Sequence, residues 1–230
     1  MPNEIKMVVF DMAGTTVDED NIVYKTLQKA INEAGFDFSL EQVLAEGAGK
    51  EKKQAIRSIL ARYENIENEG LVDSIYESFR QQLDQAYERE EIVPQKNAEE
   101  LFRALKERNI LVVLNTGYDR ITAQSIIDKL RWKEGEQIDA LVTASDVPEN
   151  RPYPDMIHFA MKRFNITDGS QVAKIGDSTI DIKEGQNAGC GLNIGITTGA
   201  HTVEQLETAN PDKIIGDLID VLSLLDEVTA

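Results

Sequence analysis

Three aspartates of this sequence stand where a carboxylate could act on a substrate. Asp11 directly follows the apolar run MVVF, and Asp177 and Asp181 lie in the stretch GDSTID (176–181), which follows another apolar run. Carboxylates that converge repel one another, and a hard divalent cation such as Mg²⁺ relieves that repulsion. A carboxylate beside such a cation can also act as a nucleophile. We therefore expect a Mg²⁺ site that includes one nucleophilic aspartate.

Two further stretches carry groups suited to the oxygens of a phosphate. Thr116 and Gly117 belong to NTG (115–117), at the end of a third apolar run, and offer a hydroxyl and backbone N–H donors. Arg151 opens RPYPD (151–155) and offers a permanent positive charge with a planar set of donors. Together with the aspartates, these groups predict a site for phosphoryl transfer.

These side chains can meet only if the apolar runs form one sheet. Short apolar runs alternate with helical patterns, which is typical of a parallel sheet with crossover helices. In such open α/β sheets, ligands bind at the carboxyl ends of the strands, where the candidate residues lie. The runs expected to be strands are Met7–Phe10, Ile110–Leu114, Ala140–Thr143, Val172–Ile175 and Leu192–Ile196.

The segment 17–92 interrupts this alternation. It contains helical patterns only, with apolar residues spaced by three and four, as in Ile56, Ile59 and Leu60. The pattern predicts a helical cap over 17–92, inserted into an α/β core made of 1–16 and 93–230. The helices are expected at Ile22–Ala34, Leu40–Ala45, Lys52–Tyr63 and Leu71–Tyr87.

Composition excludes several classes of protein. The formal charge of −17 argues against a nucleic-acid partner, because phosphate backbones require a basic surface. No apolar run reaches 18 residues, so we expect no membrane span. A single cysteine in 230 residues fits a reducing compartment, and we expect a cytoplasmic protein.

The four chemical stretches also carry a family resemblance. DMAGTT (11–16), NTG (115–117), RPYPD (151–155) and GDSTID (176–181) resemble the four motifs of the haloacid dehalogenase superfamily. The resemblance covers essentially the whole chain and includes a helical cap after the first motif. It implies a Rossmann-like parallel sheet and a covalent aspartyl-phosphate intermediate.

The same resemblance implies roles for four residues. Asp11 would be the nucleophile, and Mg²⁺ would be held by the Asp11 carboxylate, the backbone carbonyl of Ala13 and the Asp177 carboxylate. Asp181 would support the ion from outside its direct ligands or through a water.

Two departures from the common motifs point to one branch of the superfamily. Most members have Asp-x-Asp in the first motif and a lysine in the third, whereas this chain has Ala13 and Arg151. Both departures are similar to the phosphonatase branch, whose members break carbon–phosphorus bonds. A second aspartate helps an oxygen leaving group, but a carbanion needs an electron sink, which a lysine imine provides. The resemblance implies that this lysine lies in the cap.

Lys50 fits the position of that lysine. Gly47-Ala48-Gly49-Lys50 matches the Gly-x-x-Lys cap motif of the branch. A helix N-terminus and the nearby Lys53 would both favour a neutral amine at Lys50. Three interpretations stay open for Lys50: a Schiff-base lysine, a lysine that only binds phosphate, and a surface residue. Lys53 is expected to bind phosphate, and Lys52 is expected to point to water.

Our leading hypothesis is a Mg²⁺-dependent hydrolase that cleaves the C–P bond of a 2-oxoalkylphosphonate such as phosphonoacetaldehyde. The alternative is a phosphatase or phosphomutase acting on a small phosphate ester, against which Ala13 counts. A protein that only binds a metabolite would need neither Asp11 nor Asp177. The partner in the leading hypothesis is a small anionic organophosphorus substrate, and the resemblance allows a homodimer.

Overall fold

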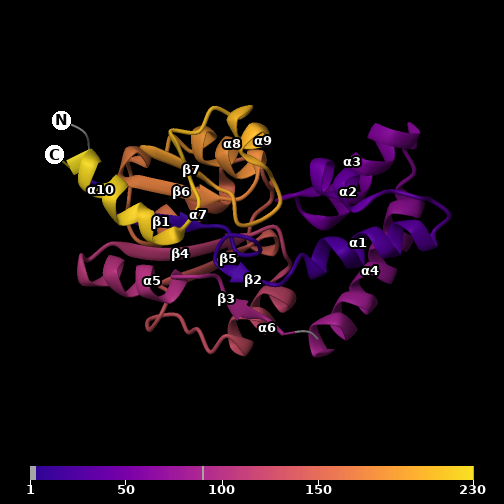
Figure 1. Ribbon diagram of the computed structural model, residues 1–230, viewed down its shortest axis with the longest axis horizontal. Coiled ribbons are helices and arrows are strands. Elements are labelled where there is room, and N and C mark those ends of the chain that lie inside the picture. Colours follow the sequence, from indigo (N-terminus) through magenta and orange to yellow (C-terminus); the bar gives the residue numbers. More distant parts are fainter. Residues whose placement is uncertain (1–3, 90, 230) are drawn as a thin grey trace.

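A six-stranded parallel sheet forms the centre of the larger part of the molecule (Figure 1). The computed structural model describes residues 4–89 and 91–229. The strand order is β5-β4-β1-β6-β7-β8. Their bounds are β1 Met7–Phe10, β4 Leu111–Thr116, β5 Ala140–Thr143, β6 Val172–Gly176, β7 Leu192–Ile196 and β8 Lys213–Ile215. The predicted α/β fold with a parallel sheet is thus confirmed.

The central strand β1 is buried on both faces because helices cover the sheet on both sides. Met7 and Val9 pack in one apolar cluster, with residues of helix α7 (Asp155–Arg163). Val8 and Phe10 point to the opposite face and pack with residues of α5 (Ala98–Glu107). The side chains of a strand alternate between its faces, so the apolar run MVVF serves both layers.

The strand order reverses direction at β1. The chain places β4 and β5 on one side of β1, and then β6, β7 and β8 on the other. Such a reversal leaves a crevice at the carboxyl ends of the strands, where ligands bind in open α/β sheets. The other core helices are α6 Arg120–Lys129, α8 Thr179–Asn187, α9 Val203–Glu207 and α10 Val221–Thr229, with short 3₁₀ turns at Ala144–Asp146, Gly169–Gln171 and Leu218–Asp220.

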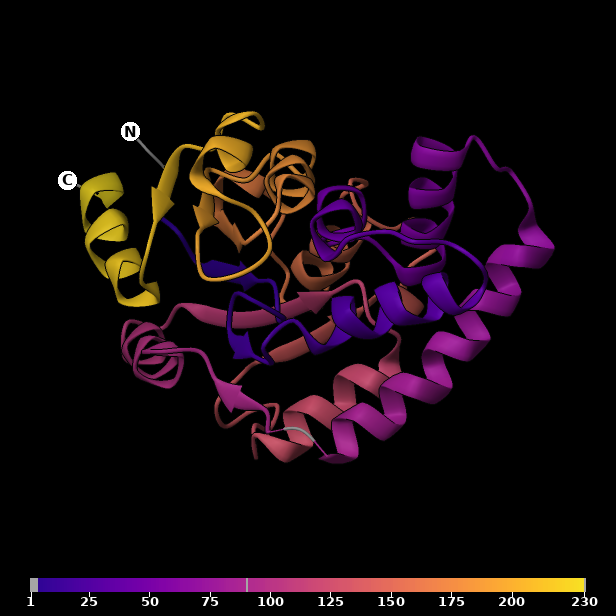
Figure 2. The ribbon, with the colours of Figure 1, turned by 45° about the vertical axis from the view of Figure 1, so that its right-hand side comes forward.

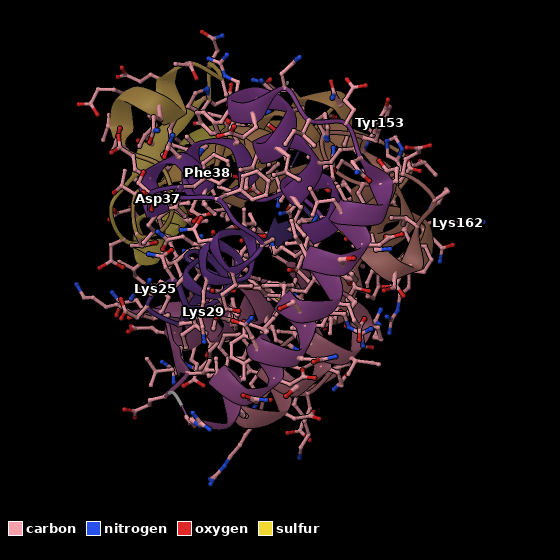
Figure 3. The ribbon with its side chains drawn as sticks, turned by 90° about the vertical axis from the view of Figure 1, so that its right-hand side faces the viewer. Lys25, Lys29, Asp37, Phe38, Tyr153 and Lys162 are labelled. Atoms are coloured by element: carbon pink, nitrogen blue, oxygen red, sulfur yellow. The ribbon has the colours of Figure 1, made fainter. Side chains whose placement is uncertain are left out.

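Four helices lie beside this edge of the sheet, in the segment that the sequence predicts to be a cap (Figure 2). They are α1 Ile22–Glu33, α2 Leu40–Gly47, α3 Lys52–Glu64 and α4 Glu69–Arg89. Helix α1 buries Val23, Leu27 and Ile31 on one face, while Lys25 and Lys29 project to solvent, as Figure 3 shows. This 3.6-residue periodicity is what the sequence predicted for the cap.

Two short strands connect the cap to the core. β2 (Val17–Asp18) pairs antiparallel with β3 (Val93–Pro94), so the outgoing and returning segments of the chain lie side by side. The sequence predicted only helices between 17 and 92 and missed β2. It also missed β8, whose three residues pair with the edge of β7. Among the described residues, no helix has the length and apolar character needed to cross a membrane.

Candidate active site

Asp11 directly follows the last residue of β1, at the carboxyl edge of the sheet. Its backbone N–H donates to the carbonyl of Ile175 on β6, and its own carbonyl accepts from the Thr16 hydroxyl at 2.9 Å. The next residues turn tightly, because the N–H groups of Thr16 and Val17 both donate to the Met12 carbonyl. Asp11 as a whole is 5% exposed and therefore lies inside the crevice.

The three predicted aspartates come together at this point. Carboxylate oxygens of Asp11, Asp177 and Asp181 all lie within 4.8 Å of one another. Burial raises the pKa of Asp11, and the nearby charge of Asp181 adds to that effect. Burial also raises the pKa of Asp177 well above its usual range, with the charge of Asp11 as the next cause. Such a donor set fits a hard divalent cation, which would stabilise the ionised carboxylates.

Arg151 contacts Asp11 and Asp181 of this cluster and is 1% exposed. Its Nη1 donates to Asp11 Oδ1 at 2.7 Å and to the Gly49 carbonyl at 3.3 Å. Its Nη2 donates twice to Asn115, and its Nε donates to Glu184 at 2.8 Å. These contacts use all five N–H groups of the guanidinium.

The predicted role of Arg151 in binding phosphate stays a prediction. Protein groups occupy all five of its donors, and Arg151 holds Oδ1 of Asp11 in place. It also forms an ion pair with Asp181 at 3.0 Å.

Sequence analysis missed three buried residues around this arginine: its partners Asn115 and Glu184, and Lys174, which shares those partners. The Lys174 ammonium donates to Asn115 Oδ1 at 2.7 Å and lies 3.0 Å from Asp181 and 3.4 Å from Glu184. A lysine inside the apolar strand VAKIG was the signal available, since a buried ammonium needs anionic partners. Asn115 and Glu184 carried no comparable signal in the sequence.

The cap loop between α2 and α3 lies directly on the core. Gly117 contacts this loop so closely that a Cβ atom there would lie 2.7 Å from the carbonyl oxygen of Lys50. A Cβ atom at Gly49, whose φ is +72°, would lie 2.4 Å from the Ser178 hydroxyl. Thr116 is buried beside this contact, and its hydroxyl accepts from the N–H of Tyr118 at 3.2 Å. The predicted role of Thr116 and Gly117 in phosphate binding stays a prediction.

The three cap lysines differ in their surroundings, and one of them contradicts its prediction. The Lys50 ammonium lies 4.0 Å from Glu46 at the edge of the cap. Lys53 pairs with Asp73 at 2.6 Å, and its side chain is 42% exposed. Lys52, expected to point to water, is only 5% exposed, so that prediction is wrong.

Lys52 is the cap lysine that faces the core. It is the first residue of α3, and its ammonium donates to the Lys50 carbonyl at 2.9 Å. The ammonium also lies 5.0 Å from the ring centre of Tyr24 and 5.1 Å from that of Tyr118. Burial lowers the pKa of Lys52 to about 8, and the largest opposing influence is the charge of Asp11.

A pocket opens beside Lys52 between cap and core. Its walls include Phe79 and Leu83 of α4 on one side and Gly117 and Tyr118 on the other. The walls combine apolar side chains with charged groups of both signs, and Lys52 supplies the one ammonium among them. A small organic group entering here would therefore meet the Lys52 amine.

Comparison with known proteins agrees with the fold. The sequence profile of the family described as haloacid dehalogenase-like hydrolase matches residues 8–194. The chain therefore belongs to the haloacid dehalogenase-like hydrolases, and it is an enzyme of that superfamily.

Two relatives with similar sequences both have phosphonoacetaldehyde hydrolase in their names. The chain is 31% identical over 223 residues to a phosphonoacetaldehyde hydrolase of Bacillus mycoides (strain KBAB4), covering 90% of this chain and 83% of the relative. It is 30% identical over 223 residues to a bifunctional phosphonoacetaldehyde hydrolase/aminoethylphosphonate transaminase of Clostridioides difficile (strain 630). That match covers 91% of this chain but only 34% of the longer protein.

Solved structures show the same fold at lower identity. A hydrolase from Pseudomonas syringae has a TM-score of 0.84 at 21% identity, covering 96% of this chain and 98% of that one. A phosphonoacetaldehyde hydrolase-like protein from Oleispira antarctica has a TM-score of 0.83 at 20% identity, covering 99% and 93%. A predicted phosphoglycolate phosphatase from Haemophilus somnus has a TM-score of 0.78 at 19% identity, covering 96% and 98%.

The aspartate cluster predicts a measurable cation effect. Mg²⁺ at a hundredfold excess over its dissociation constant should stabilise the protein by about 2.7 kcal/mol, and Asp177→Asn should remove most of that gain. The effect should weaken as pH falls, because protons compete for carboxylates whose pKa values are raised. Thermal unfolding with and without Mg²⁺ measures both. Asp128→Asn, at an exposed position on α6, is the matched control. Equal Mg²⁺ stabilisation of all three proteins would contradict the predicted site.

Proposed function

We propose that this hydrolase cleaves the C–P bond of a 2-oxoalkylphosphonate such as phosphonoacetaldehyde, with Asp11 as nucleophile and Lys52 as the amine that forms a Schiff base. The observation that carries the proposal is the location of Lys52, buried between cap and core and within the electrostatic influence of Asp11. The names of the relatives that share most of this chain support the same substrate class.

Lys52 takes the role that the sequence assigned to Lys50. With a pKa of about 8, Lys52 is partly neutral near neutral pH, as a nucleophilic amine must be. Burial also lowers the pKa of Lys50, opposed by the charge of Glu46, so the choice of Lys52 rests on its position beside Tyr24 and Tyr118. Gly49, in the loop before α3, lets the backbone approach the core closely enough to bring Lys52 to the crevice.

The proposed reaction begins at Lys52. Its neutral amine adds to the carbonyl carbon of the substrate, and the adduct takes up a proton and loses water to give an iminium ion. Asp11 Oδ2 then attacks phosphorus, and the electron pair of the C–P bond moves into the iminium to form an enamine. The enamine takes a proton on carbon. One water then releases the carbonyl product and a proton from Lys52, and a second water releases phosphate from Asp11.

The chain's own residues prepare this chemistry. Arg151 holds Asp11 Oδ1 at 2.7 Å and so orients the second oxygen of the carboxylate. Asp11, Asp177 and the carbonyl of Ala13 would hold Mg²⁺, which supplies positive charge beside the phosphoryl oxygens, and Asp181 would support it from the Arg151 side. Ala13 offers no acid, and an enamine leaving group requires none at that position.

The first test compares substrates and lysine variants. Free phosphate should be released from 2-oxoalkylphosphonates much faster than from simple phosphate esters. Lys52→Arg should lose C–P cleavage by at least about a hundredfold, because arginine keeps the charge but cannot form an imine. Lys50→Arg, the matched control two residues away, should keep most of its activity. An active Lys52→Arg enzyme, or a preference for phosphate esters, would favour the phosphatase or phosphomutase alternative.

Ala13 provides an independent test of the leaving group. Ala13→Asp should not accelerate C–P cleavage, whereas slow hydrolysis of phosphate esters should rise, because an acid there assists an oxygen leaving group. The ratio of the two rates, measured with one phosphonate and one ester, is the readout. Marked acceleration of phosphonate cleavage would refute this account of Ala13.

A further inference from the structure

Glu19 is a buried carboxylate that the proposed reaction does not yet use. It lies in the segment that leads from β2 into α1 and is 3% exposed. The Tyr87 hydroxyl donates to Glu19 Oε2 at 2.6 Å, and the Tyr118 hydroxyl donates to Glu19 Oε1 at 3.2 Å. The carboxylate thus sits where the outgoing segment of the cap, its returning helix α4 and the core loop after β4 meet.

Tyr118 connects Glu19 to Lys52. Its hydroxyl donates to the Glu19 carboxylate. Its ring forms a cation–π contact with the Lys52 ammonium, which lies 5.1 Å from the ring centre. The second ring beside that ammonium belongs to Tyr24, at 5.0 Å. One aromatic side chain therefore contacts both a buried base and a buried amine.

We propose that Glu19 is a positioning residue that shares one proton with Lys52. When the substrate enters, the proton leaves Lys52 Nζ and ends on a Glu19 carboxylate oxygen, so the nitrogen lone pair becomes free to form the C–N bond. The transfer converts an ammonium and a carboxylate into an amine and a carboxylic acid. It therefore removes two charges from a desolvated space, where each is costly.

Charges around the two groups support this sharing. Burial raises the pKa of Glu19 to about 7, opposed by the Tyr87 and Tyr118 hydrogen bonds, then by the Lys52 charge and the Val23 N–H group. For Lys52, whose pKa is lowered to about 8, the opposing charges are Asp11, Glu51 and Glu19, while Arg151 adds to the lowering.

Burial of both groups makes proton transfer between them less unfavourable. In water the pKa values of lysine and glutamate differ by about six, so the transfer would be roughly a millionfold unfavourable. Here burial raises the pKa of Glu19 to about 7 and lowers that of Lys52 to about 8, so the difference that opposes the transfer is much smaller. Burial raises the pKa of Tyr24, Tyr87 and Tyr118 well above the usual range, so these groups stay neutral hydroxyls across the working pH.

A substitution of Glu19 tests the sharing directly. In Glu19→Gln the loss of a negative charge should destabilise the Lys52 ammonium, so its pKa falls. Trace labelling with acetic anhydride from pH 6 to 10, read at Lys52 by peptide mass spectrometry, should show the midpoint moving down by roughly half a pH unit or more. Glu46→Gln is the matched control, because Glu46 pairs with Lys50 in the same cap. It should leave the Lys52 midpoint unchanged.

The conservative variant separates charge from packing. Glu19→Asp keeps a carboxylate and should return the Lys52 midpoint toward the wild-type value. If Glu19→Gln leaves the midpoint unmoved, or Glu19→Asp shifts it as far as Glu19→Gln does, the proposal is overturned. Thermal unfolding of each variant verifies that the fold is retained.

Activity supplies a second readout, which rests on the function proposed above. In Glu19→Gln the rising limb of kcat/KM against pH should move to lower pH, while kcat falls at least about tenfold, because glutamine cannot hold the proton. A Glu19 that only ties the cap segments together would lower activity without moving the limb. The labelling result stands without any substrate, so it distinguishes failure of the shared proton from failure of the proposed function.

Discussion

The site depends on one buried guanidinium. Arg151 uses all five N–H groups on protein partners, and these partners come from three parts of the chain: the core strand ends, α8 and the cap loop at Gly49. Without its positive charge, Asp11, Asp181 and Glu184 would be buried with far too little compensation, which is strongly unfavourable. The same contacts orient Asp11, so one interaction both permits the acidic cluster to be buried and orients the proposed nucleophile.

Division of the chemistry between core and cap follows from this constraint. The core carries the carboxylates, among them the proposed nucleophile Asp11, while its buried lysine, Lys174, is held by Asn115 and Asp181. The proposed amine therefore comes from the cap, on the first turn of α3. The β2–β3 pair fixes the two connecting segments, and Glu19 continues from β2 into the space beside Lys52.

The fold and the acidic cluster could be predicted from the sequence because each follows from a local pattern. Short apolar runs ending in polar loops predict parallel strands, and the strand ends predict that Asp11, Asp177 and Asp181 converge. β8 was missed because three residues at a sheet edge leave too little pattern.

The lysines and Arg151 could not be assigned in the same way. In GAGKEKK a shift of two residues moves the buried lysine from Lys50 to Lys52, and only the path of the loop at Gly49 decides between them. For Arg151, the spacing of the motifs identified a positive charge near the site. Its hydrogen-bond partners could not be predicted, because Asn115, Glu184 and Gly49 lie far apart in sequence. Glu19 and its tyrosine partners likewise form a cluster only in three dimensions.

Chemical trapping tests the central claim, that Lys52 of the cap forms an imine with the substrate whose phosphorus Asp11 of the core attacks. Borohydride reduces an iminium to a stable secondary amine, so incubation with a 2-oxoalkylphosphonate and borohydride should inactivate the enzyme. Peptide mapping should then find the carbon skeleton of the substrate on Lys52, with Lys50 and Lys53 unmodified. Full activity after this treatment, or modification at Lys50 in place of Lys52, would contradict the account.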